Sequence, residues 1–260
     1  MEEGSSIENL EGELERHFGH KGFRSGQRQV VATLLEGRSA LAVFPTGGGK
    51  SLCYQLPAIL LDGLTLVVSP LIALMKDQVA VLVKRGIAAA RLDSTLTVGE
   101  VAAVYEGMVN GTLKLLYVAP ERFVSETFVA KIKRAKISLL AIDEAHCISE
   151  WGHNFRPEYL RLAALAKKFR IKRVLALTAT ATPPVVAEIC AGFGIKKKDC
   201  VQTSFLRRNL AMHITSVSAD QRLALLTQKL TTSAHIPAIV YVTLQHTAES
   251  VVGHLQKSGL

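Results

Sequence analysis

Short apolar runs separated by longer amphipathic stretches are the feature that most limits the folds open to this chain. The runs are rich in Val, Leu and Ile and do not alternate with polar residues, as expected for parallel strands buried on both faces. We predict strands at Leu41–Phe44, Leu64–Ser69, Leu113–Ala119, Ser138–Ile142 and Arg173–Leu177. Helical patterns lie between them, at Leu71–Arg85, Val98–Val109 and Tyr159–Phe169. This alternation predicts an α/β fold with an open parallel sheet, whose ligands bind at the carboxyl ends of the strands.

The two ends of the chain have their own patterns. A capping box at Ser5–Glu8 predicts a first helix that begins near Ser5, with Ile7, Leu10, Leu14 and Phe18 on one stripe. A second unit is predicted after Ser204, so that the domains are residues 1–204 and 205–260. Its expected strands are Asn209–Val217 and Ala238–Leu244, and its expected helices are Ala219–Leu230 and Gln245–Gln256. Two strands and two helices are too few for an independent domain.

A glycine-rich loop, Phe44–Ser51, follows the first predicted strand and precedes a predicted helix. Glycines allow backbone N–H groups to approach phosphates, and the start of a helix adds a partial positive charge. Lys50 is expected to reach the outer phosphates of a nucleotide, and Ser51 to hold Mg²⁺. The predicted nucleotide-binding residues here are Thr46, Gly47, Gly48, Gly49, Lys50 and Ser51. The alternative is a flexible glycine turn, which the flanking strand and helix disfavour.

Two carboxylates, Asp143 and Glu144, follow the predicted strand Ser138–Ile142. Asp143 is expected to orient the Mg²⁺ shell, and Glu144 to position or deprotonate an attacking water. Such a pair after a strand is often only a solvated turn, but its place downstream of the phosphate loop favours a catalytic role for Asp143, Glu144 and Lys50.

Hydroxyl side chains follow the last predicted strand of the first unit. Thr178 and Thr180 could sense the outermost phosphate and pass its state to a neighbouring surface. Thr182 before Pro183 also suits the start of a helix, with threonine as the cap. Both interpretations can hold together.

Charge and cysteine content narrow the class of partner. The net charge is +9, and the acidic residues 1–16 leave +14 for the remainder of the chain. A basic body favours a polyanion such as nucleic acid, although solvated lysines and arginines spread over the surface would give the same net charge.

The four cysteines form no C-x-x-C pair, so we expect buried free thiols in a reducing compartment and no zinc site. No apolar run is long enough to span a membrane, and the acidic start is not a signal peptide.

Together these motifs resemble one family, the RecQ-type ATP-dependent DNA helicases of the DEAD/DEAH superfamily of two-lobed motors. The resemblance runs from about Phe18 to the end of the chain. It covers Phe23–Gln27, Val68–Gln78, Tyr117–Arg122, the Asp-Glu-Ala-His box at 143–146, Cys147–Tyr159 and Phe205–Leu210. It implies a RecA-like first lobe built around the phosphate loop, followed by a truncated second RecA-like lobe in which Ile239–Thr243 is the first strand.

The resemblance also implies roles for further residues. Gln27 would bond the adenine edge, and Arg24 would pack near the base. The aromatic-rich segment after the box would contact single-stranded DNA and report its presence to the hydrolytic site. The residues implied for DNA binding and coupling are His146, Trp151, His153, Phe155, Arg156, Thr178 and Thr180. Tyr159 lies close to them, and aromatic faces stack on unpaired bases without reading sequence. The alternative for Trp151 is packing against its own domain.

Five positions depart from the family pattern: His20 stands for an aromatic residue, Ser25 for Pro, Glu150 for Gln, Asn154 for Asp, and Arg208 for Pro. Asn154 loses a charge that could pair with Arg156, which affects the expected coupling of DNA to hydrolysis rather than the fold.

The resemblance implies an enzyme that couples Mg²⁺-dependent ATP hydrolysis to translocation on single-stranded DNA and to duplex unwinding in repair and recombination. Its partners would be single-stranded and duplex DNA, and the rest of the second lobe, with zinc-binding and winged-helix regions, is expected outside this chain. A half-motor that binds ATP and nucleic acid without turnover is one alternative, and an RNA-directed relative is another. The expected location is the bacterial cytoplasm with the nucleoid, or the nucleus of a eukaryote.

Overall fold

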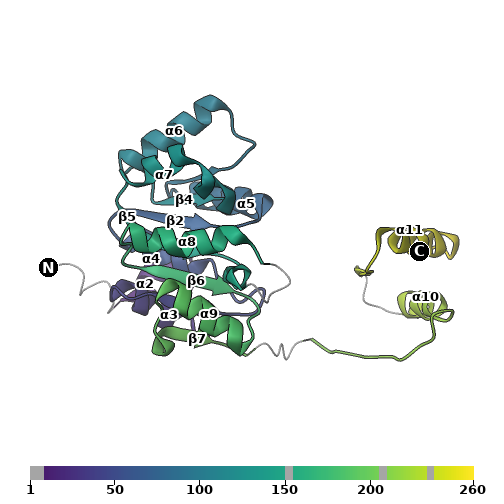
Figure 1. Ribbon diagram of the computed structural model, residues 1–260. Helices are drawn as coiled ribbons and strands as arrows, with labels where there is room; N and C mark the ends of the chain where they lie inside the picture. The colour runs from purple at the N-terminus through teal and green to yellow at the C-terminus, as the bar shows by residue number, and fades with distance from the viewer. Residues whose placement is uncertain (1–8, 150–154, 205–209, 233–236) are drawn as a thin grey trace. The chain divides into compact units, whose positions relative to one another are not determined.

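The computed structural model describes residues 9–149, 155–204, 210–232 and 237–260 (Figure 1). The chain divides into two compact units, Met1–Leu206 and Arg207–Leu260, which are described separately. The predicted helix start at Ser5 and the predicted DNA-contacting residues Trp151 and His153 lie outside the described residues, as do Glu150, Asn154 and Arg208.

The first unit contains a parallel sheet of seven strands in the order β3-β4-β2-β5-β6-β1-β7. Each predicted strand is present and its ends lie within two residues of the prediction, which confirms the α/β class. Two strands were not predicted, because β3 contains an arginine and β7 has only three residues. The strands are β1 Ala40–Val43, β2 Leu64–Val68, β3 Ala89–Leu92, β4 Leu115–Val118, β5 Ile137–Ile142, β6 Val174–Thr178 and β7 Cys200–Gln202.

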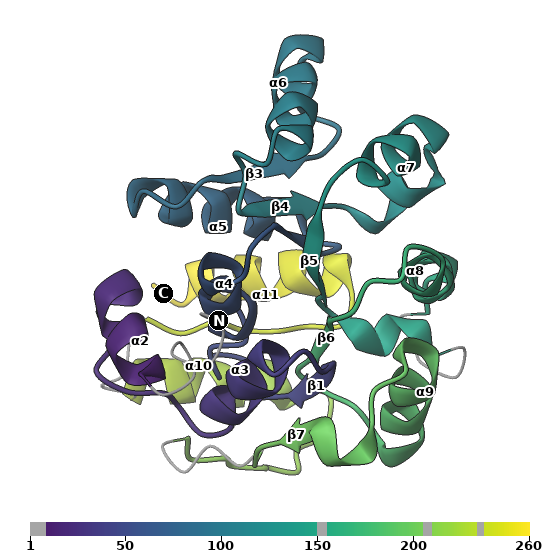
Figure 2. The ribbon, with the colours of Figure 1, turned by 90° about the vertical axis from the view of Figure 1, so that its left-hand side faces the viewer.

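Helices cover both faces of this sheet, as Figure 2 shows. One face carries α2 Leu10–Phe18, α3 Gln27–Leu35, α4 Leu52–Leu60 and α5 Ile72–Lys84. The other carries α6 Val98–Val109, α7 Glu126–Ile132, α8 Pro157–Lys168 and α9 Pro183–Phe193. Short 3₁₀ turns lie at Pro120–Val124, Ala145–Ile148 and Lys197–Asp199.

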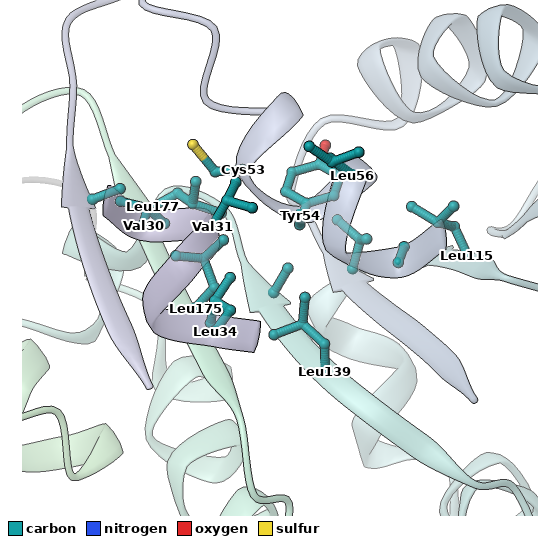
Figure 3. Packing of buried hydrophobic residues seen from close by; sticks show 14 of the residues in the cluster. Val30, Val31, Leu34, Cys53, Tyr54, Leu56, Leu115, Leu139, Leu175 and Leu177 are labelled. Carbon is teal, nitrogen blue, oxygen red and sulfur yellow. The ribbon is translucent and has the colours of Figure 1, made fainter. Parts of the chain in front are cut away.

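Each strand contributes side chains to two separate hydrophobic clusters. In β6, Leu175 and Leu177 join the cluster under α3 and α4, whereas Val174 and Ala176 join the cluster under α8 and α9. Figure 3 shows Leu34 of α3 beside Leu175 and Val30 of the same helix beside Leu177. Because neighbouring residues of a strand point to opposite faces, a strand covered on both sides must be apolar throughout. This explains the continuous apolar runs in the sequence.

The predicted capping box at Ser5–Glu8 lies outside the described residues, and the first described helix, α2, has another cap. Asn9 caps α2, since its Oδ1 accepts a hydrogen bond from the Gly12 amide at 3.2 Å, and the predicted stripe of Leu10, Leu14 and Phe18 is buried. Helix α9 begins at Pro183 after Thr182, as predicted, but the Thr182 side chain makes no capping hydrogen bond.

Within the described part of the chain, the edge strand β7 pairs with β1 alone, the strand that leads into the phosphate loop. Their register places Leu41 opposite Cys200 and Val43 opposite Gln202. Strand β1 also pairs with β6 on its other side, so its backbone is hydrogen-bonded along both edges.

In the second unit, the two predicted helices are confirmed as α10 Arg222–Thr232 and α11 Gln245–Lys257. The two predicted strands are wrong over their described residues, because neither 210–217 nor 238–244 forms a strand. Their apolar side chains remain exposed, including Ile214 at 96% and Tyr241 at 88%. A strand needs a neighbour to accept its backbone hydrogen bonds, and the described part of this unit provides none. That this unit begins a second lobe stays a prediction. No helix in the described ranges is long and apolar enough to cross a membrane.

Candidate nucleotide-binding and hydrolytic site

The phosphate loop has the predicted structural setting, between β1 and α4. Gly47 and Gly49 have φ angles of 78° and 76°, in the left-handed region that favours glycine. A Cβ atom at Gly48 would lie 2.8 Å from the carbonyl oxygen of Pro45, so a side chain does not fit there. The loop therefore needs its glycines, which supports a built phosphate cradle over an ordinary flexible turn.

Lys50 folds back over this loop. Its Nζ donates a hydrogen bond to the carbonyl oxygen of Phe44 at 3.3 Å. The ammonium also lies close enough to the two carboxylates after β5 to stabilise their charged forms. Lys50 thus links the loop after β1 to the end of β5, two strands away in the sheet.

Asp143 is held in place by its neighbours. Its Oδ2 accepts a hydrogen bond from Ser69 Oγ at 3.4 Å, and its Oδ1 accepts one from the Glu144 amide at 3.1 Å. Burial raises the pKa of Asp143, and the adjacent Glu144 carboxylate raises it further. Ser69 belongs to Val68–Gln78, one of the segments that carry the resemblance, but its contact with Asp143 was not predicted. Its place directly after β2, which neighbours β5, is the signal that could have found it.

Glu144 has an unusual backbone conformation. Its φ and ψ of 50° and 42° lie in the left-handed region, which costs a residue with a side chain about 1–2 kcal/mol. A hydrogen bond with His146 lowers the pKa of the Glu144 carboxyl, so the group is ionised at neutral pH. Backbone strain of this kind concentrates at functional sites. Here the left-handed residue carries an ionised carboxylate just after β5.

A chain of polar contacts connects Glu144 to the end of β6. Nδ1 of His146 lies 3.2 Å from Oε2 of Glu144 and 3.0 Å from Oγ1 of Thr178. The Thr178 hydroxyl donates to the carbonyl oxygen of Thr180 at 2.9 Å, so it accepts from His146. Sequence motifs that lie far apart in the chain are therefore in direct contact, as their shared edge of the sheet requires.

The protonation of His146 gives a pH-dependent prediction. Hydrogen bonds with Cys147 and Glu144 raise the pKa of His146 to about 9. A raised pKa means that the folded protein binds this proton more tightly than the unfolded chain does. The resulting stability is present below the ordinary histidine pKa of 6.5 and is lost as the pH rises through about 9. We expect the free energy of unfolding to fall by roughly 1 kcal/mol, because the pair is partly solvated.

Urea unfolding at about pH 6 and about pH 9.5, in the absence of nucleotide, measures this difference. His146→Gln cannot carry the charge, so its free energy of unfolding should change less over this interval than that of the unmodified protein. Equal changes in both proteins would contradict the protonated contact.

The two residues implied to read the base bind the loop itself. Gln27 is buried, and its Nε2 donates to the carbonyl oxygen of Gly49 at 2.9 Å while its Oε1 accepts from the Arg24 amide at 2.8 Å. Arg24 donates through Nη1 to the carbonyl oxygen of Gly47. Both side chains therefore lie beside the phosphate loop, and their contact with a base stays a prediction.

The segment expected to contact DNA is only partly described. Phe155 is half-buried and Arg156 is exposed at the start of α8, whereas Trp151 and His153 lie outside the described residues. The suggestion that Tyr159 offers a stacking face is wrong, because its side chain is fully buried. Its Oη donates to the carbonyl oxygen of Asp143 at 3.0 Å, so Tyr159 holds the backbone of Asp143 in place.

The oxygen-bearing side chains around Lys50 fit a magnesium ion of the kind that nucleotides carry. Mg²⁺ is commonly held by one or two carboxylates together with substrate phosphates and water. Asp143 would supply the carboxylate, and Ser51, which directly precedes α4, would supply a hydroxyl. Among the described residues no group of three or more His, Cys, Asp or Glu side chains could hold a metal by itself. Bound there, Mg²⁺ would neutralise phosphate charge.

Comparison with known proteins gives a consistent family. The family described as "DEAD/DEAH box helicase" matches residues 24–189. The chain is 40% identical to the ATP-dependent DNA helicase RecQ of Bacillus subtilis over 247 residues, which cover 94% of this chain and 42% of that protein. It is 47% identical to the RecQ of Pasteurella multocida over 193 residues, covering 74% of this chain and 30% of that one.

Solved structures agree on the fold. The crystal structure of the DUF1998 helicase MrfA bound to DNA superimposes with a TM-score of 0.71 at 17% identity, covering 94% of this chain and 36% of that chain. This likeness concerns the fold alone. The chain spans less than half the length of the two curated relatives above.

Proposed function

The chain belongs to the DEAD/DEAH box helicase family, in its RecQ branch, and on that premise we propose that it is the ATP-hydrolysing part of a DNA helicase. The observation that carries the proposal is the contact of Glu144 with His146 and of His146 with Thr178, beside the phosphate loop. This contact connects the Glu144 carboxylate, which is suited to activating water, with Thr178 at the end of β6, which can respond to the nucleotide.

Each residue has a role in hydrolysis that follows from its chemistry. The backbone amides of residues 46–51 and the Lys50 ammonium bind the phosphates. Gln27 and Arg24 lie beside this loop and contact the base. Asp143 and Ser51 hold Mg²⁺, which neutralises phosphate charge when bound. Glu144 positions the attacking water and accepts its proton.

Coupling to DNA extends the same proposal. Single-stranded DNA contacts Phe155, Arg156 and the neighbouring residues Trp151 and His153, and its presence reaches Glu144 through the segment that joins them. The motor translocates on single strands and opens duplexes in repair and recombination. Support for the nucleic acid comes from the relatives, which are named DNA helicases.

ATP hydrolysis with and without single-stranded DNA tests this function. We expect stimulated turnover, with weaker stimulation by RNA of the same sequence. Nucleotide binding without turnover would instead support a half-motor, and equal or greater stimulation by RNA would support an RNA-directed enzyme.

Thr178→Val tests the coupling step, because it removes the hydroxyl that contacts His146 while keeping the shape of the side chain. The stimulation by DNA should fall by about fivefold or more, in line with the usual size of coupling between sites. Thr65→Val is the matched control. Thr65 is equally buried in a strand, and its hydroxyl has no hydrogen-bond partner among the described residues. Equal stimulation in both variants would refute a role for Thr178.

A further inference from the structure

The positive charge of the first unit is concentrated at the edge of the sheet opposite the hydrolytic site. Three segments lead from a helix into the amino end of a strand: residues 131–136 before β5, 167–173 before β6 and 194–199 before β7. They carry four, five and three basic residues, and Asp199 is their only acidic one. These three segments form the amino-edge surface. Figure 2 shows α7, α8 and α9, which precede them, in a row on one face of the sheet.

Most of these charges have no partner in the part of the chain that the structure describes. Lys131 lies over the ring of Tyr105, Lys136 pairs with Asp62, and Arg173 donates to the carbonyl oxygen of Leu34. The other basic side chains of the amino-edge surface are exposed and have no hydrogen bond, ion pair or ring contact with any described residue. Favourable placement at a helix end explains basic residues in the last turn, but that effect fades beyond it. Lys172 lies past the end of α8 and Lys196 past the end of α9, whereas Lys197 and Lys198 belong to the short turn Lys197–Asp199.

Arg170 provides an independent sign of function, because this charged residue has a strained backbone conformation. It follows α8 with a φ of 51°, and the amides of Arg170 and Ile171 bond the carbonyl oxygens of Lys167 and Ala166 at 3.1 and 3.0 Å. This is a Schellman turn, whose left-handed position is normally glycine. Five other helices of the unit have glycine in this conformation at their ends, namely Gly19, Gly37, Gly86, Gly111 and Gly194.

The same arginine lines a recess in the amino-edge surface. A cavity of about 150 Å³ lies between the segments before β5 and β6, with Arg170 and Lys133 in its wall. Two cations from different segments therefore border one depression that an anionic group can enter. Backbone strain kept at an exposed arginine beside such a recess indicates a ligand rather than a packing role.

We propose that the amino-edge surface is a second nucleic-acid contact, which holds the phosphate backbone of duplex DNA. The three segments contain one aromatic residue, Phe169, and it packs against the core. Stacking on unpaired bases is therefore not available, whereas contact with phosphates needs only cations. The six residues of β5 separate the two edges by about 20 Å at ~3.3 Å per residue, so this duplex would lie apart from the hydrolytic site.

Neutralising the amino-edge surface is the direct test. The edge variant combines Lys133→Gln, Lys172→Gln and Lys197→Gln in the full chain. The control variant combines Lys84→Gln, Arg161→Gln and Lys257→Gln, which removes the same charge from exposed positions elsewhere. Fluorescence anisotropy with a blunt duplex and no ATP should show at least tenfold weaker binding at ~0.1 M salt for the edge variant only. The slope of log K against log salt should fall by about 0.9 for each phosphate that the variant no longer neutralises.

Arg170→Gly separates binding from folding. Glycine relieves the left-handed strain, so the melting temperature should stay the same or rise while the duplex affinity falls. A lower melting temperature with unchanged affinity would show that Arg170 serves the fold and would overturn its part in duplex binding.

Other outcomes also decide the proposal. Equal losses of affinity in the edge and control variants would show that only total charge matters and would overturn it. Edge-dependent binding of poly-glutamate without binding of the duplex would overturn it in favour of an acidic protein partner. Hydrolysis of ATP without DNA should be the same in both variants, so that failure of this proposal leaves the proposed hydrolytic function standing.

Discussion

Replacing Lys50 with alanine is expected to lower ATP hydrolysis by about 100- to 1,000-fold, the usual effect of removing one donor that stabilises transition-state charge. Lys50 is the one cation that bridges the phosphate loop and the Asp143–Glu144 pair among the described residues. Without its ammonium, negative charge that builds up on the phosphates is opposed by two nearby carboxylates. Steady-state hydrolysis at saturating single-stranded DNA measures the effect.

The control for this variant is Lys21→Ala, which removes an exposed lysine from the same unit. It should retain full turnover. ATP binding by the Lys50 variant, followed with a fluorescent nucleotide, should weaken as well, since the ammonium contacts phosphates before and during reaction. Near-normal hydrolysis by Lys50→Ala would show that the phosphate loop takes no part in ATP hydrolysis.

Glu144→Gln is expected to reduce hydrolysis by about 100- to 10,000-fold while ATP binding survives, because a positioned general base contributes that much. The amide has the shape of the carboxylate but accepts no proton from water. It also replaces the ion pair with His146 by a neutral contact. Burst and steady-state measurements would place the defect in the chemical step.

Glu106→Gln, an exposed exchange on α6, serves as the control for Glu144→Gln. The unfolding free energy of both variants should also be compared, because removing the ion pair with His146 destabilises the fold slightly. Retention of more than a tenth of the original turnover by Glu144→Gln would show that another group activates the water.

The sequence predicted the centre of the sheet better than its margins. Strands β1, β2, β4, β5 and β6 are apolar because helices cover both of their faces, and that burial is visible in the sequence. Strands β3 and β7 lie at the two ends of the sheet order, where Arg91 and Gln202 are tolerated, so their pattern was hidden. The two wrong strands in the second unit have suitable composition. What they lack among the described residues is a neighbouring strand, which no local pattern can reveal.

At the site, the motifs predicted which residues would carry the chemistry but not how those residues contact one another. Lys50, Asp143 and Glu144 were predicted from their position after strands. The contact of His146 with Thr178 depends on β5 and β6 being neighbours, and the position of Tyr159 under Asp143 depends on the packing of α8. Strand order and helix packing are tertiary properties, so these contacts could be found only in three dimensions.

The distribution of basic residues over the surface also depends on tertiary structure. The net charge of +9 predicted a polyanionic partner, and the sequence motifs predicted its contacts at the carboxyl ends of the strands. The lysines and arginines before β5, β6 and β7 come together only because their strands share one end of the sheet.

The pairing of β7 with β1 has a consequence for the order of folding during synthesis. Residues 200–202 form the last strand of the first unit to leave the ribosome, yet they cover one side of the strand that leads into the phosphate loop. Until they emerge, β1 has an open edge whose backbone groups can pair with another chain. Shortening the unit before Cys200 would make that exposure permanent, so a nascent or cleaved chain that ends there should aggregate even though every residue predicted to bind the nucleotide is present.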